Sequence, residues 1–280
     1  MLNSRTIFLT VLALLAFAGN SLLARVALKQ TNIDPASYTS IRLISGAVML
    51  WLLTRVTGRT QIAGNWLSAL ALFVYGAGFS FAYTNLSAGT GALLLFGAVQ
   101  TTMIGYGLWR GERLGNTQWL GLALALAGLI GLMLPGLAAP PLLASILMLA
   151  AGIAWGAYSL RGKGASDPIL VTTGNFLRAA PFAVALSLIF VNRANLGGNG
   201  FWYAIVSGVL TSAIGYAIWY AALPHLKATT AATLQLSVPI LAALGGIAFL
   251  SEPPNLRLVL ASLVILGGIA LVTLEKKSSV

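Results

Sequence analysis

The chain of 280 residues contains no cysteine, one histidine and five acidic residues. Without cysteine it can form neither disulfides nor thiolate metal sites. One histidine and scattered carboxylates supply too few ligands for a metal cluster, so we expect neither a metal nor another cofactor.

Charged residues of either sign are scarce. Only 8% of the residues are charged, 58% are hydrophobic and the mean hydropathy is +0.91. A soluble domain carries about 25% charged residues, so this composition predicts an integral membrane protein. The net charge of +11 does not indicate nucleic-acid binding, because the cations stand singly or in pairs at the ends of apolar runs and form no basic stripe.

The apolar runs have the length of membrane-spanning helices, about 20 residues each. They lack the alternation of barrel strands, so the predicted fold is an all-α membrane protein with ten transmembrane helices. The expected spans are 5–28, 36–55, 65–85, 88–109, 116–134, 142–160, 168–191, 200–222, 227–250 and 255–274.

The cations are distributed unevenly between the two sides of these spans. With the N-terminus inside, ten of the sixteen Lys and Arg fall on the inner side, four on the outer side and two within spans. Short cytoplasmic loops carry such an excess. We therefore expect a multi-pass protein of the inner (cytoplasmic) membrane with both termini in the cytoplasm.

The second half of the chain repeats the first. Residues 88–134 align without gaps on residues 228–274, and Glu112 and Glu252 occupy matching positions. We predict a five-helix repeat at 1–138 and a second one at 139–280. Because five is odd, the second repeat enters the membrane inverted. Inverted repeats are typical of transporters, whose binding site lies between the halves near the midplane.

The chain resembles the drug/metabolite transporter superfamily, in particular its ten-span branch with duplicated EamA domains. The resemblance is carried by the repeat, by the apolar-Arg opening of the second span (YTSIRLISGAVMLWLL, 38–53) and by the Gly/Ser-Glu step before each final span. Among members it looks most like YddG-type exporters of aromatic and other neutral amino acids. The resemblance implies a central cavity lined by the first, third, fourth, sixth, eighth and ninth spans.

Two glutamates lie in turns between spans. Glu112 and Glu252 stand beside Arg113 and Arg257, which favours structural ion pairs at helix N-termini over a gating role.

Two arginines lie within spans. Arg42 and Arg178 lie 10–15 Å along their helices, by about 1.5 Å per residue. Each could reach the interface or neighbouring carbonyls, or attract a substrate carboxylate. We favour the first reading, because these two spans are expected to be peripheral.

Aromatic and amide side chains recur on the spans that the resemblance places around the cavity. Rings offer stacking contacts, and amides and hydroxyls could bind an α-amino and an α-carboxylate group. The predicted cavity residues are Asn20, Tyr75, Phe79, Tyr83, Phe96, Gln100, Trp155, Tyr158, Tyr216, Trp219, Gln235 and Ser237.

No span carries a carboxylate near its middle, which disfavours proton-coupled efflux of cations. We therefore expect export of neutral amino acids or similar metabolites by alternating access. The expected partners are the small-molecule substrate and the lipid bilayer, with no obligate protein partner.

Three alternatives remain. One is a permease for sugars, nucleosides or phosphorylated metabolites. A second is an intramembrane enzyme, for which the sequence offers no catalytic constellation. The third is a receptor or scaffold, for which an inverted repeat has no obvious purpose.

Overall fold

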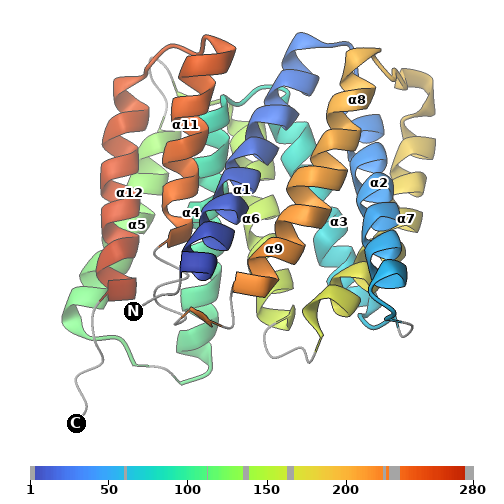
Figure 1. Ribbon diagram of the computed structural model, residues 1–280. Coiled ribbons are helices and arrows are strands. Elements are labelled where there is room, and N and C mark those ends of the chain that lie inside the picture. The colour runs from blue at the N-terminus through green and yellow to red at the C-terminus, as the bar shows by residue number, and fades with distance from the viewer. Residues whose placement is uncertain are drawn as a thin grey trace.

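The computed structural model describes residues 4–59, 62–111, 113–134, 139–162, 167–222, 225–226 and 234–274. Within them the chain is all-α, as predicted, and its helices form a bundle (Figure 1). The first half contains α1 (Ser4–Gln30), α2 (Pro35–Val56), α3 (Trp66–Tyr83), α4 (Ala88–Trp109) and α5 (Asn116–Met133). The second half contains α6 (Leu142–Gly162), α7 (Pro168–Ile189), η1 (Val191–Arg193), α8 (Asn199–Val206), η2 (Ser207–Ile214), α9 (Gly215–Ala222), α11 (Ser237–Leu250) and α12 (Leu256–Leu274).

Ten segments of the described chain correspond to the ten predicted spans. Eight are long and apolar enough to cross a membrane, and the described parts of the last two, Ser237–Leu250 and Leu256–Val272, are shorter. The predicted eighth span is one rod built from α8, η2 and α9 (Figure 1). Its middle, η2, is a π-helix, which hydrophobic periodicity did not reveal. Wide turns of this kind are rare and often occur at functional sites.

Asp-Pro pairs start the corresponding helices α2 and α7. Asp34 accepts hydrogen bonds from the backbone N–H groups of Ala36 and Ser37, both at 2.9 Å. Asp167 does the same for the second and third residues of α7, at 3.0 and 3.1 Å. Proline suits the position that follows, because its missing N–H has no partner in the first turn. Each cap contributes about 1 kcal/mol to helix stability.

The direction of the helices shows that the halves are inverted. Arg25, near the end of α1, donates to the carbonyl of Tyr83 at the end of α3, at 3.1 Å. Arg161, at the end of α6, donates to Ser68 at the start of α3, at 3.0 Å. The corresponding helices α1 and α6 therefore run in opposite directions. Accordingly, α1 begins and α12 ends at the same end of the bundle (Figure 1).

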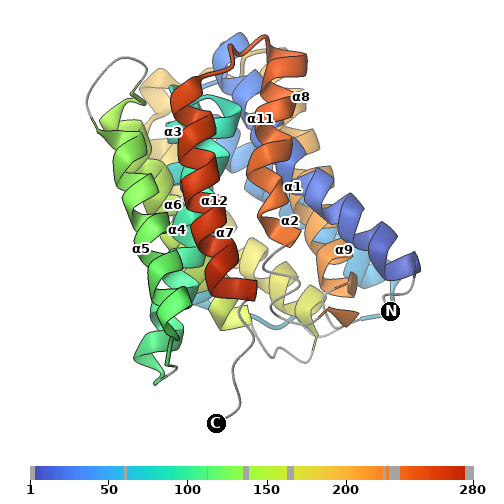
Figure 2. The same cartoon turned by 90° about the vertical axis from the view of Figure 1, so that its left-hand side faces the viewer.

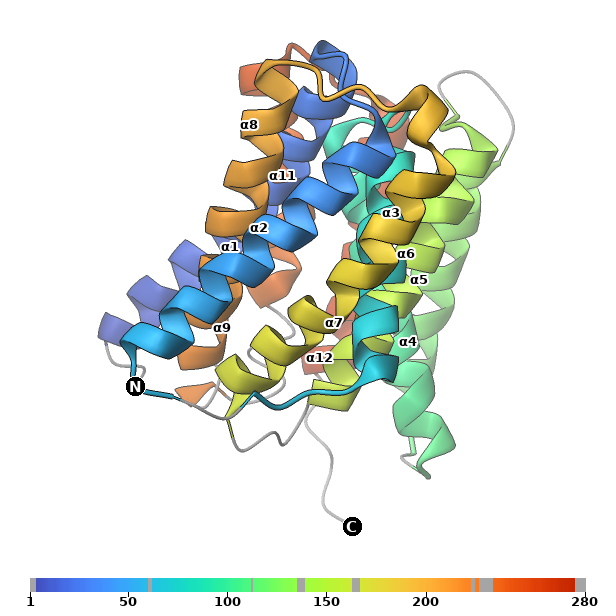
Figure 3. The ribbon, with the colours of Figure 1, turned by 90° about the vertical axis from the view of Figure 1, so that its right-hand side faces the viewer.

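Helix packing follows the same pseudo-two-fold relation. The contact of α3 with α6 has its counterpart in α1 with the rod of α8, η2 and α9, and α4 with α6 has its counterpart in α1 with α11. Three contacts join a helix to its own counterpart: α2 with α7, α4 with α11, and α5 with α12. Figure 3 shows α2 and α7 on one side of the bundle, and Figure 2 shows α5 beside α12 on another.

Glycines allow α5 and α12 to meet through their backbones. A Cβ atom added to Gly121 would collide with the carbonyl oxygen of Gly268, and a Cβ added to Gly268 would collide with that of Gly121. In the membrane, helices associate through such close packing and not through the hydrophobic effect. The two final helices of the repeats therefore form a tight seam.

Candidate substrate-binding cavity

A small cavity of about 20 Å³ lies between the two halves. Its lining comes from α1, α3, α4, α6, α9 and the helical turn just before α11, which are the six spans that the sequence pointed to. The lining residues are Phe17, Asn20, Ser21, Tyr75, Phe79, Leu95, Phe96, Trp155, Tyr216 and Gln235. Such a space holds about one water molecule, whereas ligand pockets usually exceed about 300 Å³. In this structure the cavity is therefore too small for a solute of that size.

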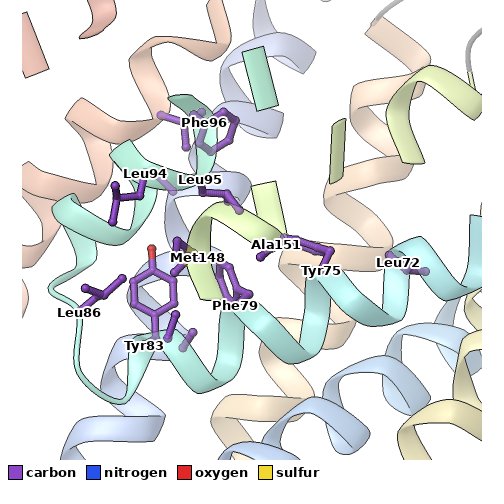
Figure 4. Close-up of a cluster of buried hydrophobic side chains, with 14 of the residues drawn as sticks. Leu72, Tyr75, Phe79, Tyr83, Leu86, Leu94, Leu95, Phe96, Met148 and Ala151 are labelled. Atoms are coloured by element: carbon purple, nitrogen blue, oxygen red, sulfur yellow. The ribbon is translucent and has the colours of Figure 1, made fainter. Parts of the chain in front are cut away.

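Aromatic rings fill the cavity walls. The ring centroid of Trp155 lies 4.8 Å from that of Tyr75 and 5.0 Å from that of Tyr216. Tyr75 also packs on Phe79, one turn further along α3, at 5.5 Å. Figure 4 shows this row on α3 beside Leu95 and Phe96 of α4. Because the rings come from α3, α6 and α9, a shift of any of these helices changes the cavity volume.

A hydrogen-bonded network surrounds Asn20 near the middle of α1. Its amide nitrogen donates to the hydroxyl of Tyr75 at 3.2 Å. Its amide oxygen accepts from Ser207 at 2.8 Å and from Thr211 at 3.2 Å, both on the π-helix η2. Buried amides in a membrane need such partners. The network joins both halves without any acidic group.

Arg42 differs from the interpretation favoured by the sequence. Its side chain is not at a helix end near the interface: the residue is only 2% exposed and lies against the aromatic wall. Its Nη2 donates to the hydroxyl of Tyr75 at 3.0 Å, and its Nε donates to Ser212 of η2 at 3.1 Å. The guanidinium carbon stands 5.2 Å from the ring centroid of Tyr75 and 4.9 Å from that of Phe79. Distance along the helix does not tell which way a side chain faces, and packing of α2 on η2 turns Arg42 inward.

Seven of the twelve predicted cavity residues line this cavity, and five do not. Tyr83 continues the aromatic row of α3 but donates to the carbonyl of Ala88 at 3.3 Å, where α4 begins. Tyr158 lies behind the wall with its ring 5.4 Å from that of Trp155. Trp219 belongs to a separate cluster with Ala13. The other two are Gln100, which is buried in α4, and Ser237, which bonds to the carbonyl of Leu234 in its own turn.

Three lining residues, Phe17, Ser21 and Leu95, were not predicted. Phe17 lies three residues before Asn20 on α1, so the helical period could have identified it, whereas Ser21 is adjacent to Asn20 and lies four residues after Phe17. Leu95 has no such signal, because α4 is apolar nearly all round.

Glu252 forms an ion pair and caps a helix start, as expected, but the expected partner was wrong. It pairs with Arg25 of α1 at 2.9 Å and accepts from the backbone N–H of Ala88 at 2.9 Å, at the start of α4. Arg257 donates instead to the carbonyl of Gly131 at 2.9 Å. The helix N-terminus that attracts the carboxylate is therefore that of α4, not that of the following helix. Glu112 lies outside the described residues.

Arg178, unlike Arg42, bonds to neighbouring carbonyls, as the sequence favoured for both arginines. Its Nη1 donates to the carbonyls of Ala63 at 2.9 Å and Gly174 at 3.0 Å. It thus satisfies carbonyls of a neighbouring segment and of its own helix.

A larger hollow of about 600 Å³ lies between α11 and α12, over the start of α4. Its walls include Leu244, Val259 and Leu263, which are 59%, 50% and 67% exposed. Exposed apolar walls on a membrane protein contact lipid chains. This hollow therefore belongs to the outer surface of the bundle.

Comparison with known proteins defines the family. Residues 4–134 and 142–274 each match the model of the EamA-like transporter family. The chain is 57% identical over 274 residues to an uncharacterized protein of Pseudomonas aeruginosa, covering 97% of this chain and 96% of that protein. It is 22% identical over 289 residues to an uncharacterized transporter of Archaeoglobus fulgidus, covering 98% and 99%. A crystal structure of a protein with 17% identity superposes with a TM-score of 0.68 over 99% of both chains, which shows the shared fold.

The chain belongs to the EamA-like transporter family. It is a multi-pass membrane transporter of a small molecule and not an enzyme.

Proposed function

We propose that this transporter exports amino acids with neutral side chains, aromatic ones included, or similar small metabolites by alternating access. The supporting observation is the cavity between the inverted halves, lined by aromatic rings and by the uncharged polar groups of Asn20, Ser21 and Gln235. Rings provide contacts for an apolar or flat side chain, and amides and hydroxyls provide hydrogen bonds. In this proposal the seven predicted residues that line the cavity contact the substrate.

The described acids favour a neutral or zwitterionic substrate over an organic cation. Asp34 and Asp167 cap helices at the membrane edge, and Glu252 is paired with Arg25. None of these described carboxylates lies on the cavity wall. Transporters that exchange a cation for a proton usually do so at a buried acid. We therefore propose transport without a midplane carboxylate for proton coupling.

For orientation, we propose that both termini face the cytoplasm of the inner membrane, with the repeats meeting at residues 138 and 139. The excess of Lys and Arg on that side supports this. Single cysteines introduced at positions 113 and 257 of this cysteine-free chain should react with an impermeant thiol reagent from opposite sides. Labelling of both from one side would contradict the inverted arrangement.

Uptake of labelled amino acids into proteoliposomes tests the function. We expect saturable uptake of aromatic or other neutral amino acids. Trp155→Ala should raise the KM about tenfold, because a buried aromatic contact is worth about 1.4 kcal/mol. Trp202→Ala is the matched control: Trp202 is 63% exposed on α8 and should leave the KM unchanged. Uptake of a sugar phosphate but of no amino acid would overturn the proposal.

A further inference from the structure

Two buried polar atoms of the described chain have no hydrogen-bond partner, and both belong to α2. They are the hydroxyl of Tyr38 and Nη1 of Arg42. The residues are 0% and 2% exposed and lie four positions apart, so they share one face of the helix. Buried donors are nearly always satisfied, so two orphans on one face require an explanation.

Arg42 is a buried cation without a counterion among the described residues. The described carboxylates of Asp34, Asp167 and Glu252 are engaged at helix ends. Hydrogen bonds to Tyr75 and Ser212 fix the guanidinium through Nη2 and Nε, and two ring faces attract its charge. These neutral contacts orient the group but leave its charge uncompensated. The site is thus preorganised for an anion that the described chain does not supply.

The guanidinium of Arg42 lies against two residues of the cavity wall. Tyr75 and Phe79 line the cavity and also lie beside the guanidinium. The hydroxyl of Tyr75 accepts hydrogen bonds from both Arg42 and Asn20, so it links the guanidinium to a polar group of the cavity wall. A shift of the rings of Tyr75 and Phe79 would expose the guanidinium to the cavity.

We propose that Arg42 and Tyr38 form a binding site for a carboxylate of the transported solute, an inference that rests on the proposed function. One carboxylate oxygen accepts from Nη1 of Arg42 and the other accepts from the hydroxyl of Tyr38. The single positive charge matches a monocarboxylate, whereas a phosphate group usually binds more than one cation. The body of the solute then lies among the rings of the cavity. Because Nε of Arg42 is bonded to Ser212, occupation of the site also bears on η2 of the other half.

Ligand-dependent thermal stability of the purified protein in detergent tests this site. The probes are L-phenylalanine, 3-phenylpropionate, which lacks the amino group, and L-phenylalaninamide, which lacks the carboxylate. We expect both carboxylates to stabilise the protein. The amide should bind about 10- to 100-fold more weakly, because hydrogen bonds to charged groups are lost. Equal affinity for the amide and the amino acid, or no binding of either carboxylate, would overturn the proposal.

Variants assign the effect to the two residues. Tyr38→Phe removes only the orphan hydroxyl and should weaken carboxylate binding several-fold, without effect on the amide. Arg42→Met should remove carboxylate binding, and Arg42→Lys should restore part of it. Arg178→Met is the matched control, because that guanidinium bonds to carbonyls away from the cavity. Unchanged carboxylate affinity in Tyr38→Phe and in the Arg42 variants would contradict the site.

The same probes separate this inference from the proposed function. Arg42-dependent binding of 3-phenylpropionate with no uptake of any amino acid would uphold the carboxylate site and refute amino-acid export. Saturable uptake of amino acids and of their amides with equal KM would uphold amino-acid export and refute the carboxylate site.

Discussion

Helices α2 and α7 are counterparts that begin alike and then differ at their buried polar residue. Both start with an Asp cap and a proline. Eight residues after the cap, α2 carries Arg42 and α7 carries Asn175, which are 2% and 1% exposed. Asn175 uses its amide oxygen to accept from the backbone N–H of Asn65 at 3.0 Å. Arg42 uses its guanidinium to contact the cavity wall.

The difference shows that the helix starts are duplicated but this buried polar position is not. The same depth holds a neutral structural amide in one half and a cation with a free N–H group in the other. Arg178, which resembles Arg42 in the sequence, is three residues further along and serves carbonyls near its helix surface. Among the described residues, the buried charge of Arg42 therefore breaks the symmetry between α2 and α7.

The strongest test of this contrast is Asn175→Arg, which places the cation of α2 at the matching depth of α7. The new guanidinium would be buried where a much smaller amide now packs, and the backbone N–H of Asn65 would lose its acceptor. We expect a loss of about 3–5 kcal/mol of stability. Thermal unfolding in detergent, followed by tryptophan fluorescence, measures it. A melting temperature equal to that of the wild type would mean that α7 can accommodate the charge as well as α2.

A smaller effect is expected where η2 meets α2. A Cβ added to Gly208 would collide with the backbone carbonyl of Arg42 and with the hydroxyl of Ser45. Gly208→Ala should cost about 1–3 kcal/mol by forcing the helices apart. It should also weaken the bond of Ser212 to Arg42. Gly105→Ala is the control, because a Cβ there meets nothing within 4 Å. Equal melting temperatures of the two variants would show that the close approach is not needed.

The smallest effect is expected at the aspartate N-caps that α2 and α7 share. Asp34→Ala and Asp167→Ala should each cost about 0.5–2 kcal/mol, because each removes an N-cap. Asp34→Asn and Asp167→Asn keep the cap oxygen and should cost less. Asp167→Asn also removes the pair with Arg59, but both side chains are about one third exposed and such pairs are worth little. If one aspartate could be replaced by alanine without cost, the two helix starts would not be equivalent.

The fold could be predicted from the sequence because it depends on the lengths and spacing of apolar segments along the chain. Span length and the 140-residue offset between Glu112 and Glu252 predicted ten segments in two halves. The π-helix in the eighth segment could not be predicted from segment length or spacing. A wider helical turn does not change how apolar the segment is.

The cavity was only partly predictable, because the sequence gives depth along a helix but not the direction that a side chain faces. Tyr75, Phe79 and Tyr83 share one face of α3, yet Tyr83 meets the start of α4 and lies outside the cavity. Arg42 was expected to reach the interface or neighbouring carbonyls, but its side chain contacts η2 and the rings of α3. Glu252 pairs with Arg25, which is 227 residues away in the sequence. Such a pair is known only once the folded structure shows the two residues side by side.

The glycine contact between α5 and α12 bears on how the two repeats pack. Where Gly121 and Gly268 meet, two main chains touch with no side chains between them. A side chain at either position would push the two helices apart. This contact therefore fixes how closely the last helix of one repeat approaches the last helix of the other.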